Sequence, residues 1–256
     1  MIGLAEGVVQ LAVWRIDAEA PVAPDCLTPA DTARAAHFVR PEDRAASLAA
    51  RAGLRAIIGE CLGGRPRDLE FQLAPLGKPS LAGPAGVGVH FNLTHSHGLA
   101  ALAVARFPVG VDIEAVRPVE DDLAHVVFSP AELDEFAKLP PAQRRLAFFL
   151  GWTRKEAVVK ALGSGLHAPL DRFSVALTPG APARLLAMGW RPDAARGWQM
   201  ESFTVPEEHV GAIAAPETGW RLAVASNGAL AVLGLAGPAG GVAPGVTTFP
   251  RSAACG

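Results

Sequence analysis

Apolar residues recur along this chain first at helical and then at strand spacing, and the order of these patterns predicts its elements. A helical pattern runs from about Glu42 to Leu62, and Gly63-Gly64 follows as a typical stop signal. The next stretch, DLEFQLAPLGKPSL, alternates apolar and polar residues as a strand does, and VGVHFNLTHSHGLAALAVARF predicts two strands around a polar turn.

The same succession of patterns returns in the second half of the chain. Gly163 ends a helical pattern 100 residues after Gly63, Phe173 lies 102 residues after Phe71, and FTVPEEHVGAIA begins 112 residues after FNLTHSHGLAAL. Loop insertions into a duplicated α/β unit would make the offset grow in this way, whereas solenoid repeats are only about 20–50 residues long. Chance recurrence of apolar alternation is the alternative.

The patterns therefore predict an α/β (α+β) fold of two similar halves. Residues 1–107 form the N-terminal half and residues 108–236 the C-terminal half, with the join near Arg106–Pro108. The remaining segment, residues 237–256, is rich in Gly and Pro and has no periodicity, which predicts a flexible tail.

Composition narrows the functional classes. A net charge of −2 gives no bulk attraction to nucleic acid or to an anionic membrane. No stretch offers the roughly 18 uninterrupted apolar residues of a membrane span, and Glu6 interrupts an N-terminal segment that lacks the basic region of a signal peptide. The three cysteines form no CxxC pair, which argues against a disulfide framework or a structural zinc site. We expect a cytoplasmic protein.

The first candidate chemistry lies in VGVDIE, just after the predicted join. Apolar residues alternate with Gly110, Asp112 and Glu114, so the two carboxylates share one face of a strand. Carboxylates this close repel each other unless a cation lies between them. Mg²⁺ suits such a pair because it binds one or two carboxylates and completes its shell with phosphate and water. A solvent-facing edge strand is the alternative.

A second group lies on the later helix, in WTRKEAVVK. Trp152, Glu156 and Lys160 are four residues apart and therefore share a stripe. A Glu–Lys pair at this spacing is most often a surface contact of about 0.2–0.5 kcal/mol. The alternative is that Glu156 supplies a third carboxylate to the metal, while Lys160 holds an anion that bridges to the same metal.

Further polar groups lie in FNLTHSHG and LGKPS. Alternation directs Phe91 and Leu93 to the core and leaves Thr94 and His95 at the exposed end of the strand. A hydroxyl and an imidazole can bind phosphate oxygens, and the imidazole becomes cationic near a phosphate; a structural histidine is the alternative. Lys78 lies in a Gly/Pro turn, where it is either another phosphate contact or an exposed turn residue.

Four of these stretches, GKPSL, FNLTHSHG, VGVDIE and WTRKEAVVKALGSGL, occur in this order between about Phe38 and Val175. Together they resemble the Sfp-type 4′-phosphopantetheinyl transferases. The resemblance implies two halves related by a pseudo-twofold, with the active site in the cleft between them. It also implies transfer of the phosphopantetheine arm of coenzyme A to a serine of an apo carrier protein, with release of adenosine 3′,5′-bisphosphate.

The resemblance further implies a role for each candidate residue. It implies Mg²⁺ on the coenzyme A pyrophosphate, held by three carboxylates, and bases along the rest of the substrate. The metal ligands are Asp112, Glu114 and Glu156; the pyrophosphate contacts are Lys160 and His95; the contacts to the nucleotide end and its 3′-phosphate are Lys78 and Thr94; and other coenzyme A contacts are Arg34 and Ser47. Glu156, directly or through a bound water, is the candidate base for the serine proton.

The chain departs from the family pattern in two places. Thr94 stands where a serine is usual, and Arg34 stands alone where members often carry several bases, which predicts weaker binding of the nucleotide phosphate. Two other functions fit the same residues: a metal-dependent phosphohydrolase and a non-catalytic coenzyme A-binding module. For the transferase we expect a monomer that serves acyl, polyketide or peptidyl carriers of secondary metabolism.

Overall fold

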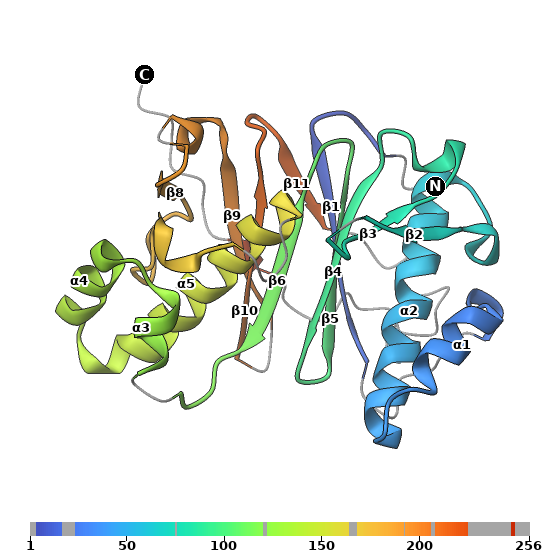
Figure 1. The fold of residues 1–256 in the computed structure, drawn as a ribbon, viewed down its shortest axis with the longest axis horizontal. Coiled ribbons are helices and arrows are strands. Elements are labelled where there is room, and N and C mark those ends of the chain that lie inside the picture. The colour runs from blue at the N-terminus through green and yellow to red at the C-terminus, as the bar shows by residue number, and fades with distance from the viewer. Residues whose placement is uncertain are drawn as a thin grey trace. The chain divides into compact units, whose positions relative to one another are not determined.

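The computed structural model describes residues 4–16, 24–74, 76–119, 122–163, 168–191, 193–205, 208–224 and 247–248. The chain divides into two compact units (Figure 1). Unit 1 comprises Met1–Phe107 with Arg221–Pro244, and unit 2 comprises Pro108–Trp220 with Gly245–Gly256.

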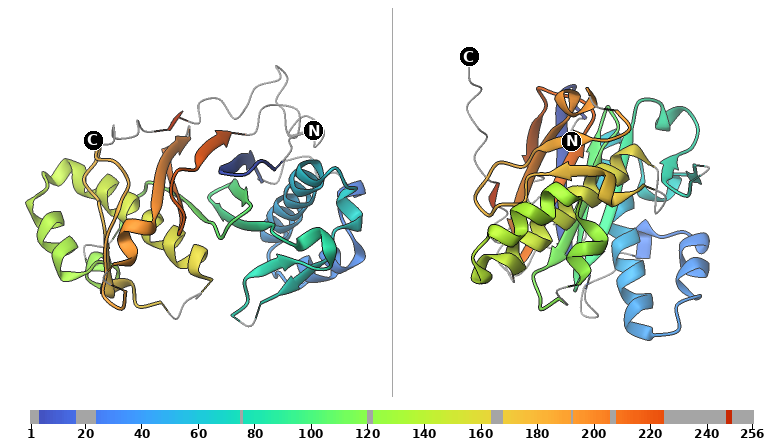
Figure 2. Two further views of the ribbon diagram at one scale, coloured as in Figure 1. Left: turned by 90° about the horizontal axis from the view of Figure 1, so that it is seen from above. Right: turned by 60° about the vertical axis from the view of Figure 1, so that its left-hand side comes forward.

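Unit 1 consists of one four-stranded sheet, a pair of helices and a small hairpin. The strand order of the sheet is β11-β1-β5-β4, in which β11 runs parallel to β1 and the other neighbours are antiparallel. The helices α1 and α2 lie side by side (Figure 2). The elements are β1 (Val8–Arg15), α1 (Pro29–Ala35), α2 (Pro41–Leu62), β2 (Phe71–Leu73), β3 (Pro79–Leu81), β4 (His90–Ser96), β5 (Leu99–Ala105) and β11 (Arg221–Val224).

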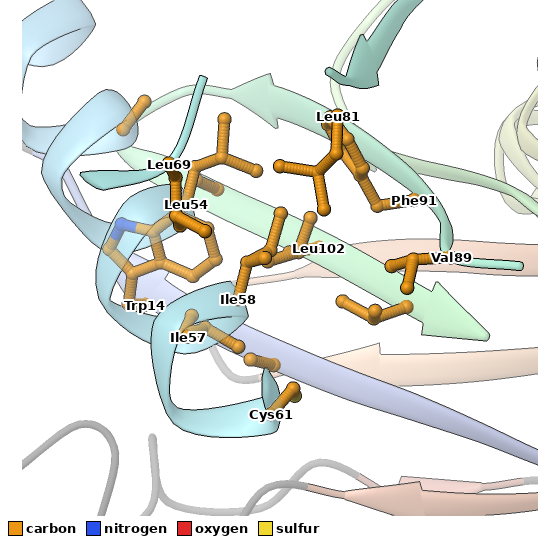
Figure 3. Close-up of a cluster of buried hydrophobic side chains, with 14 of the residues drawn as sticks. Trp14, Leu54, Ile57, Ile58, Cys61, Leu69, Leu81, Val89, Phe91 and Leu102 are labelled. Carbon is orange, nitrogen blue, oxygen red and sulfur yellow. The ribbon is translucent and has the colours of Figure 1, made fainter. Parts of the chain in front are cut away.

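The core of unit 1 forms where α2 packs on this sheet. Leu54, Ile57 and Ile58 of α2 contact Trp14 of β1 and Leu102 of β5 (Figure 3). All five side chains are no more than 2% exposed. Burial of an apolar face of this kind supplies most of the stability of such a helix.

Unit 2 repeats this plan with one additional helix. Its sheet has the order β12-β9-β10-β6, all antiparallel, and α5 packs along β6 and β10 (Figure 1). The elements are β6 (Gly110–Ala115), α3 (Leu123–Val127), α4 (Pro130–Lys138), α5 (Pro141–Leu162), β7 (Phe173–Val175), β8 (Leu185–Met188), β9 (Gln199–Val205), β10 (His209–Ala215) and β12 (Thr247–Thr248).

The predicted α/β fold with two similar halves is confirmed by this element order. In each unit a strand precedes a 22-residue helix, and a two-stranded hairpin and two antiparallel strands follow. Both helices end at a left-handed glycine, Gly63 (φ 67°) and Gly163 (φ 70°), a conformation that glycine adopts without strain. The sheet orders β1-β5-β4 and β6-β10-β9 correspond strand for strand.

One detail of the repeat prediction is wrong. The 112-residue offset of the two sequence stretches aligns His97 with His209, but His97 lies in the β4–β5 turn, whereas His209 is the first residue of β10. Strand β9 ends at Val205, two residues after Phe203, whereas β4 ends at Ser96, five residues after Phe91. The helices and strands of the two halves therefore correspond in order. The residue-to-residue alignment within the strands is shifted, and the sequence pattern alone does not show this shift.

A buried ion pair recurs at the same place in both units. In unit 1, Asp31 forms a capping box with Thr28 at the start of α1 and accepts a hydrogen bond from Arg55 of α2 at 2.7 Å. In unit 2, Glu132 forms a capping box with Ser129 and lies 2.7 Å from Lys155 of α5. Each base also donates to backbone carbonyls beyond the end of its own helix. We call these pairs the two locks.

The chain's last elements differ from the predicted boundaries. Residues 221–224 were placed in the second half, but they form β11, which pairs with β1 of unit 1. Thr247 and Thr248, placed in the tail, form β12 on β9, while residues 237–246 and 249–256 of that predicted tail lie outside the described residues. Within the described ranges, the helices are all too short or too polar to cross a membrane.

Candidate active site

A glycine allows the strand and the helix that carry the predicted metal ligands to approach closely. A Cβ on Gly110 of β6 would lie 2.0 Å from the carbonyl oxygen of Ala157 and 2.4 Å from the backbone nitrogen of Ala161, both in α5. Any larger residue would push the helix away. Gly110 therefore places α5 directly on the face of β6 that also carries Asp112 and Glu114.

Asp112 and Lys160 form an ion pair at this contact. The Nζ atom of Lys160 donates to Oδ1 of Asp112 at 2.6 Å. The side chain of Lys160 is 25% exposed and that of Asp112 is 4% exposed. Among the described strands β6 does lie at the edge of its sheet, but Asp112 does not face solvent as the alternative required, because α5 covers it. Lys160 is not confined to a surface pair with Glu156 on its own helix, because its ammonium also bonds Asp112 on β6.

Glu156 lies within electrostatic range of the same group. Burial raises the pKa of its carboxyl group, Lys160 lowers it, and the negative charge of Glu114 raises it. Glu156 and Glu114 are both half-buried. The strand and the helix thus bring together Asp112, Glu114, Glu156 and Lys160, all within unit 2.

The donor set at this contact fits Mg²⁺ by its chemistry. It consists of carboxylates, the hard oxygen ligands that Mg²⁺ prefers, in a partly exposed setting where phosphate and water can complete the shell. The side chains are not arranged as a finished metal shell: among the described residues, no three His, Cys, Asp or Glu groups lie in positions that could hold a metal ion. In this arrangement the ammonium of Lys160 supplies the positive charge next to Asp112.

In unit 1, the predicted contacts of FNLTHSHG divide by strand face. Phe91 and Leu93 pack in the core as expected, and His95 is exposed. Thr94 was expected at an exposed strand end but is only 7% exposed. It alternates onto the face opposite Phe91, and that face is buried too, which apolar alternation alone does not predict.

Lys78 lies in the turn between β2 and β3 and is half-buried. Burial lowers the pKa of its ammonium to about 8. Burial, and then the charge of Lys78, lowers the pKa of His90 at the start of β4. The proximity of His90 to this lysine was not predicted, since a histidine at a strand end has no distinctive signal in a single sequence.

We expect the KM for coenzyme A to rise between pH 7 and pH 9.5 if Lys78 binds a phosphate. The ammonium is largely charged below pH 8, and only about a tenth of it remains charged one unit above its pKa. His90, whose pKa lies below its usual value, is already neutral over this range. The Lys78→Arg variant stays charged and should show a much flatter profile. Identical KM profiles for the two proteins would exclude a phosphate contact by Lys78.

The other two predicted coenzyme A contacts lie on the helices of unit 1. Arg34 is exposed on the last turn of α1, and Ser47 is half-buried in the second turn of α2. The sequence suggested that Arg34 stands alone, but it does not. Arg51 of α2 lies near enough for the two positive charges to interact. This arginine is 17 residues from Arg34 in the chain, so only the packing of α1 on α2 reveals the pair.

The structure also separates structural bases from candidate site residues along α5. Lys155 and Arg154 are 0% and 1% exposed. Lys155 belongs to the second lock, and Arg154 donates to Ser202 Oγ and to the carbonyls of Ala176 and Ala181. Of the four charged residues in WTRKEAVVK, Glu156 and Lys160 are the two that are partly exposed.

The chain matches two family models, and the boundary between them lies where Phe107 of unit 1 meets Pro108 of unit 2. Residues 108–215 match the family described as the 4′-phosphopantetheinyl transferase superfamily, and residues 14–106 match the family described as 4′-phosphopantetheinyl transferase, N-terminal.

Individual relatives carry the same description. The chain is 35% identical over 221 residues to 4′-phosphopantetheinyl transferase HetI of Nostoc sp., which covers 83% of this chain and 90% of that protein. It is 29% identical to 4′-phosphopantetheinyl transferase Sfp of Bacillus subtilis over 59% of this chain and 66% of Sfp. It is 43% identical to 4′-phosphopantetheinyl transferase AcpT of Salmonella typhimurium over 34% of this chain and 46% of that protein. The chain therefore belongs to the 4′-phosphopantetheinyl transferase superfamily.

Proposed function

We propose that this phosphopantetheinyl transferase uses Asp112, Glu114, Glu156 and Lys160 to move the 4′-phosphopantetheine arm of coenzyme A to a serine of an apo carrier protein. The observation that carries the assignment of roles is the contact of β6 with α5. It gathers acidic groups and one ammonium in a partly exposed position, where a pyrophosphate can reach them.

The reaction is a substitution at phosphorus. The serine Oγ forms a bond to the phosphorus that carries the pantetheine arm, and the bond from that phosphorus to the bridging oxygen breaks. The leaving group is adenosine 3′,5′-bisphosphate, which takes the electron pair. Catalysis of such a step depends mostly on positioning and charge neutralisation.

The chain's own groups divide this work. Lys160 lies one helical turn from Glu156, and its ammonium can stabilise the negative charge that develops on the leaving phosphate. Glu156 is the candidate base, which would accept the serine proton directly or through a water. Asp112, Glu114 and Glu156 are the residues that would hold Mg²⁺, which when bound supplies positive charge to the pyrophosphate.

Unit 1 would contribute the contacts to the rest of coenzyme A. We assign the pyrophosphate to His95, the nucleotide end to Lys78 and Thr94, and further contacts to Arg34 and Ser47. A single chain contains both copies of the repeated unit, so we propose that it acts as a monomer. The comparisons give no support to a phosphohydrolase or to a non-catalytic coenzyme A-binding module.

A carrier-modification assay tests this function. With coenzyme A, Mg²⁺ and a panel of apo acyl, polyketide and peptidyl carriers, we expect intact-mass spectrometry to show one phosphopantetheine arm added to the carrier. Adenosine 3′,5′-bisphosphate should form in equal amount. EDTA should stop the reaction, and so should a serine-to-alanine change at the carrier's acceptor site. Bisphosphate that accumulates while every carrier stays unmodified would show hydrolysis of coenzyme A instead.

A further inference from the structure

A pocket of about 590 Å³ lies at the start of α5 and is not used by the proposed reaction. It is in unit 2, between α3, α4 and the first two turns of α5 (Figure 1). The residues proposed to bind coenzyme A or Mg²⁺, or to accept the serine proton, are not among those that line it. Its volume is typical of a small-molecule site, so its lining indicates the kind of molecule that fits.

Aromatic and aliphatic side chains form one part of the lining. Phe136 of α4 and Phe148 of α5 pack on Phe128, with ring centroids 5.5 Å and 5.6 Å from that of Phe128. Phe128 is 1% exposed, so a buried ring holds both lining rings in place before a ligand binds. The pocket therefore has a preformed apolar surface. Its other apolar lining residues are Pro118, Val119, Ala124, Leu133, Ala137 and Pro141.

Basic side chains form the other part of the lining. Two backbone carbonyls orient Arg144, whose Nε atom donates to Leu139 at 3.1 Å and whose Nη2 atom donates to Ala137 at 2.9 Å. Within the part of the chain that the structure describes, the Nη1 atom of Arg144 and the guanidinium of Arg145 donate to no residue. His125 of α3 adds an imidazole. The described lining residues include no carboxylate, so the two guanidinium groups have no negative partner there.

An amphipathic anion complements both parts of this lining. A hydrocarbon chain that leaves water for an apolar surface gains about fourfold in affinity for each fully buried methylene. A carboxylate accepts charge-assisted hydrogen bonds, and its two oxygens match the planar fork of a guanidinium. A ligand without a chain would leave the phenyl rings in contact with water, and a ligand without a negative charge would leave both guanidinium groups unused.

We propose that this pocket is a binding site for a medium-chain carboxylate. The hydrocarbon chain packs on Phe136 and Phe148, and the carboxylate pairs with Arg144 and Arg145. Three helices surround a single volume that matches one small ligand in size, and the charge of the lining selects an anion. The inference does not depend on the proposed function, because the pocket shares no residue with the proposed reaction.

Titration calorimetry of the full chain with decanoate tests the site. We expect one decanoate to bind per chain, at least about tenfold more tightly than hexanoate, because the longer chain buries more methylenes. Decyltrimethylammonium carries the same chain with a positive charge and should bind at least about tenfold more weakly than decanoate, because the lining is basic. Saturating coenzyme A should leave the affinity for decanoate unchanged, since the two sites are separate.

Variants locate the bound decanoate. The double variant Arg144→Met/Arg145→Met should bind it at least about tenfold more weakly. The matched control is Arg191→Met/Arg196→Met, which removes two exposed arginines outside the pocket and should leave the affinity unchanged. If the first double variant fails to fold, Ala137→Glu must cause the same loss. This lining position is exposed, and the new carboxylate would compete with the ligand for the guanidinium groups.

Contrary results would overturn the inference. Equal affinities for decanoate and decyltrimethylammonium, or undiminished binding in the lining variants, would show non-specific partition onto apolar surface. Displacement of decanoate by coenzyme A would place it in the site already described. A chain that does not bind decanoate also contradicts the inference. Binding of an acidic amphipathic peptide that depends on the same arginines would then assign the pocket to a helix of a partner protein.

Discussion

Replacing Asp112 with Asn should lower kcat by at least about a hundredfold while the protein remains folded. The change keeps the shape of the side chain but removes the charge that holds Lys160 at 2.6 Å and that would contribute to the metal shell. Losses of this size are typical when one electrostatic contact to the reacting group is removed. Single-turnover phosphopantetheinylation at saturating Mg²⁺ measures the effect, and circular dichroism checks the fold.

Two further variants sharpen this experiment. Asp134→Asn changes the same residue type at an exposed position on α4 and should leave kcat unchanged. Lys160→Met should lower coenzyme A binding or turnover at least about tenfold, or about 1.4 kcal/mol. Because the two groups contact each other, the Asp112→Asn/Lys160→Met double variant should lose much less than the sum of both effects. Near-normal activity in Asp112→Asn would remove this carboxylate from the site.

Replacing Lys155 with Met should lower the free energy of unfolding by about 3–5 kcal/mol, the usual loss when one partner of a buried ion pair is removed. Glu132 would keep its backbone donors but would retain a charge that is 1% exposed. The ammonium also donates to the carbonyls of Leu170 and Phe173, which would lose this partner. Urea unfolding measures the change.

The matched control is Lys138→Met, at an exposed position near the end of α4, where the change in stability should be small. The double variant Lys155→Met/Glu132→Gln removes both charges and should recover part of the lost stability. A loss below about 1 kcal/mol in Lys155→Met would mean that water reaches the pair, and that it behaves as a surface contact.

The part of the site that could be predicted from the sequence is the part encoded within single elements. Asp112 and Glu114 share a strand face through a period of two, and Glu156 and Lys160 share a helical stripe through a period of nearly four. Each pattern depends only on neighbouring residues in the sequence, so it can be recognised from the sequence alone. The same holds for the glycines that end α2 and α5.

What could not be predicted depends on which elements pack together. The contact of Lys160 with Asp112, 48 residues away in the chain, was not predicted, because no single element encodes it. Lys155 is adjacent to Glu156 and equally polar, yet its burial is decided by α4 and β7, which the sequence patterns did not reveal. The pairing of β11 with β1, from opposite ends of the chain, likewise has no local signal.

The two locks have a consequence for how this chain has evolved. Asp31 with Arg55 and Glu132 with Lys155 occupy equivalent places, but both the acid and the base differ between the copies. At the positions equivalent to Glu156 and Lys160, 100 residues earlier, α2 carries Ala56 and Glu60. Between the two halves the locks therefore differ only by an exchange of like charges, whereas α2 has no counterpart of Glu156 and Lys160, which we propose for the chemistry. Among relatives of this chain, we therefore expect a protein that lacks one partner of a lock to lack the other as well, because the remaining charge would be buried alone.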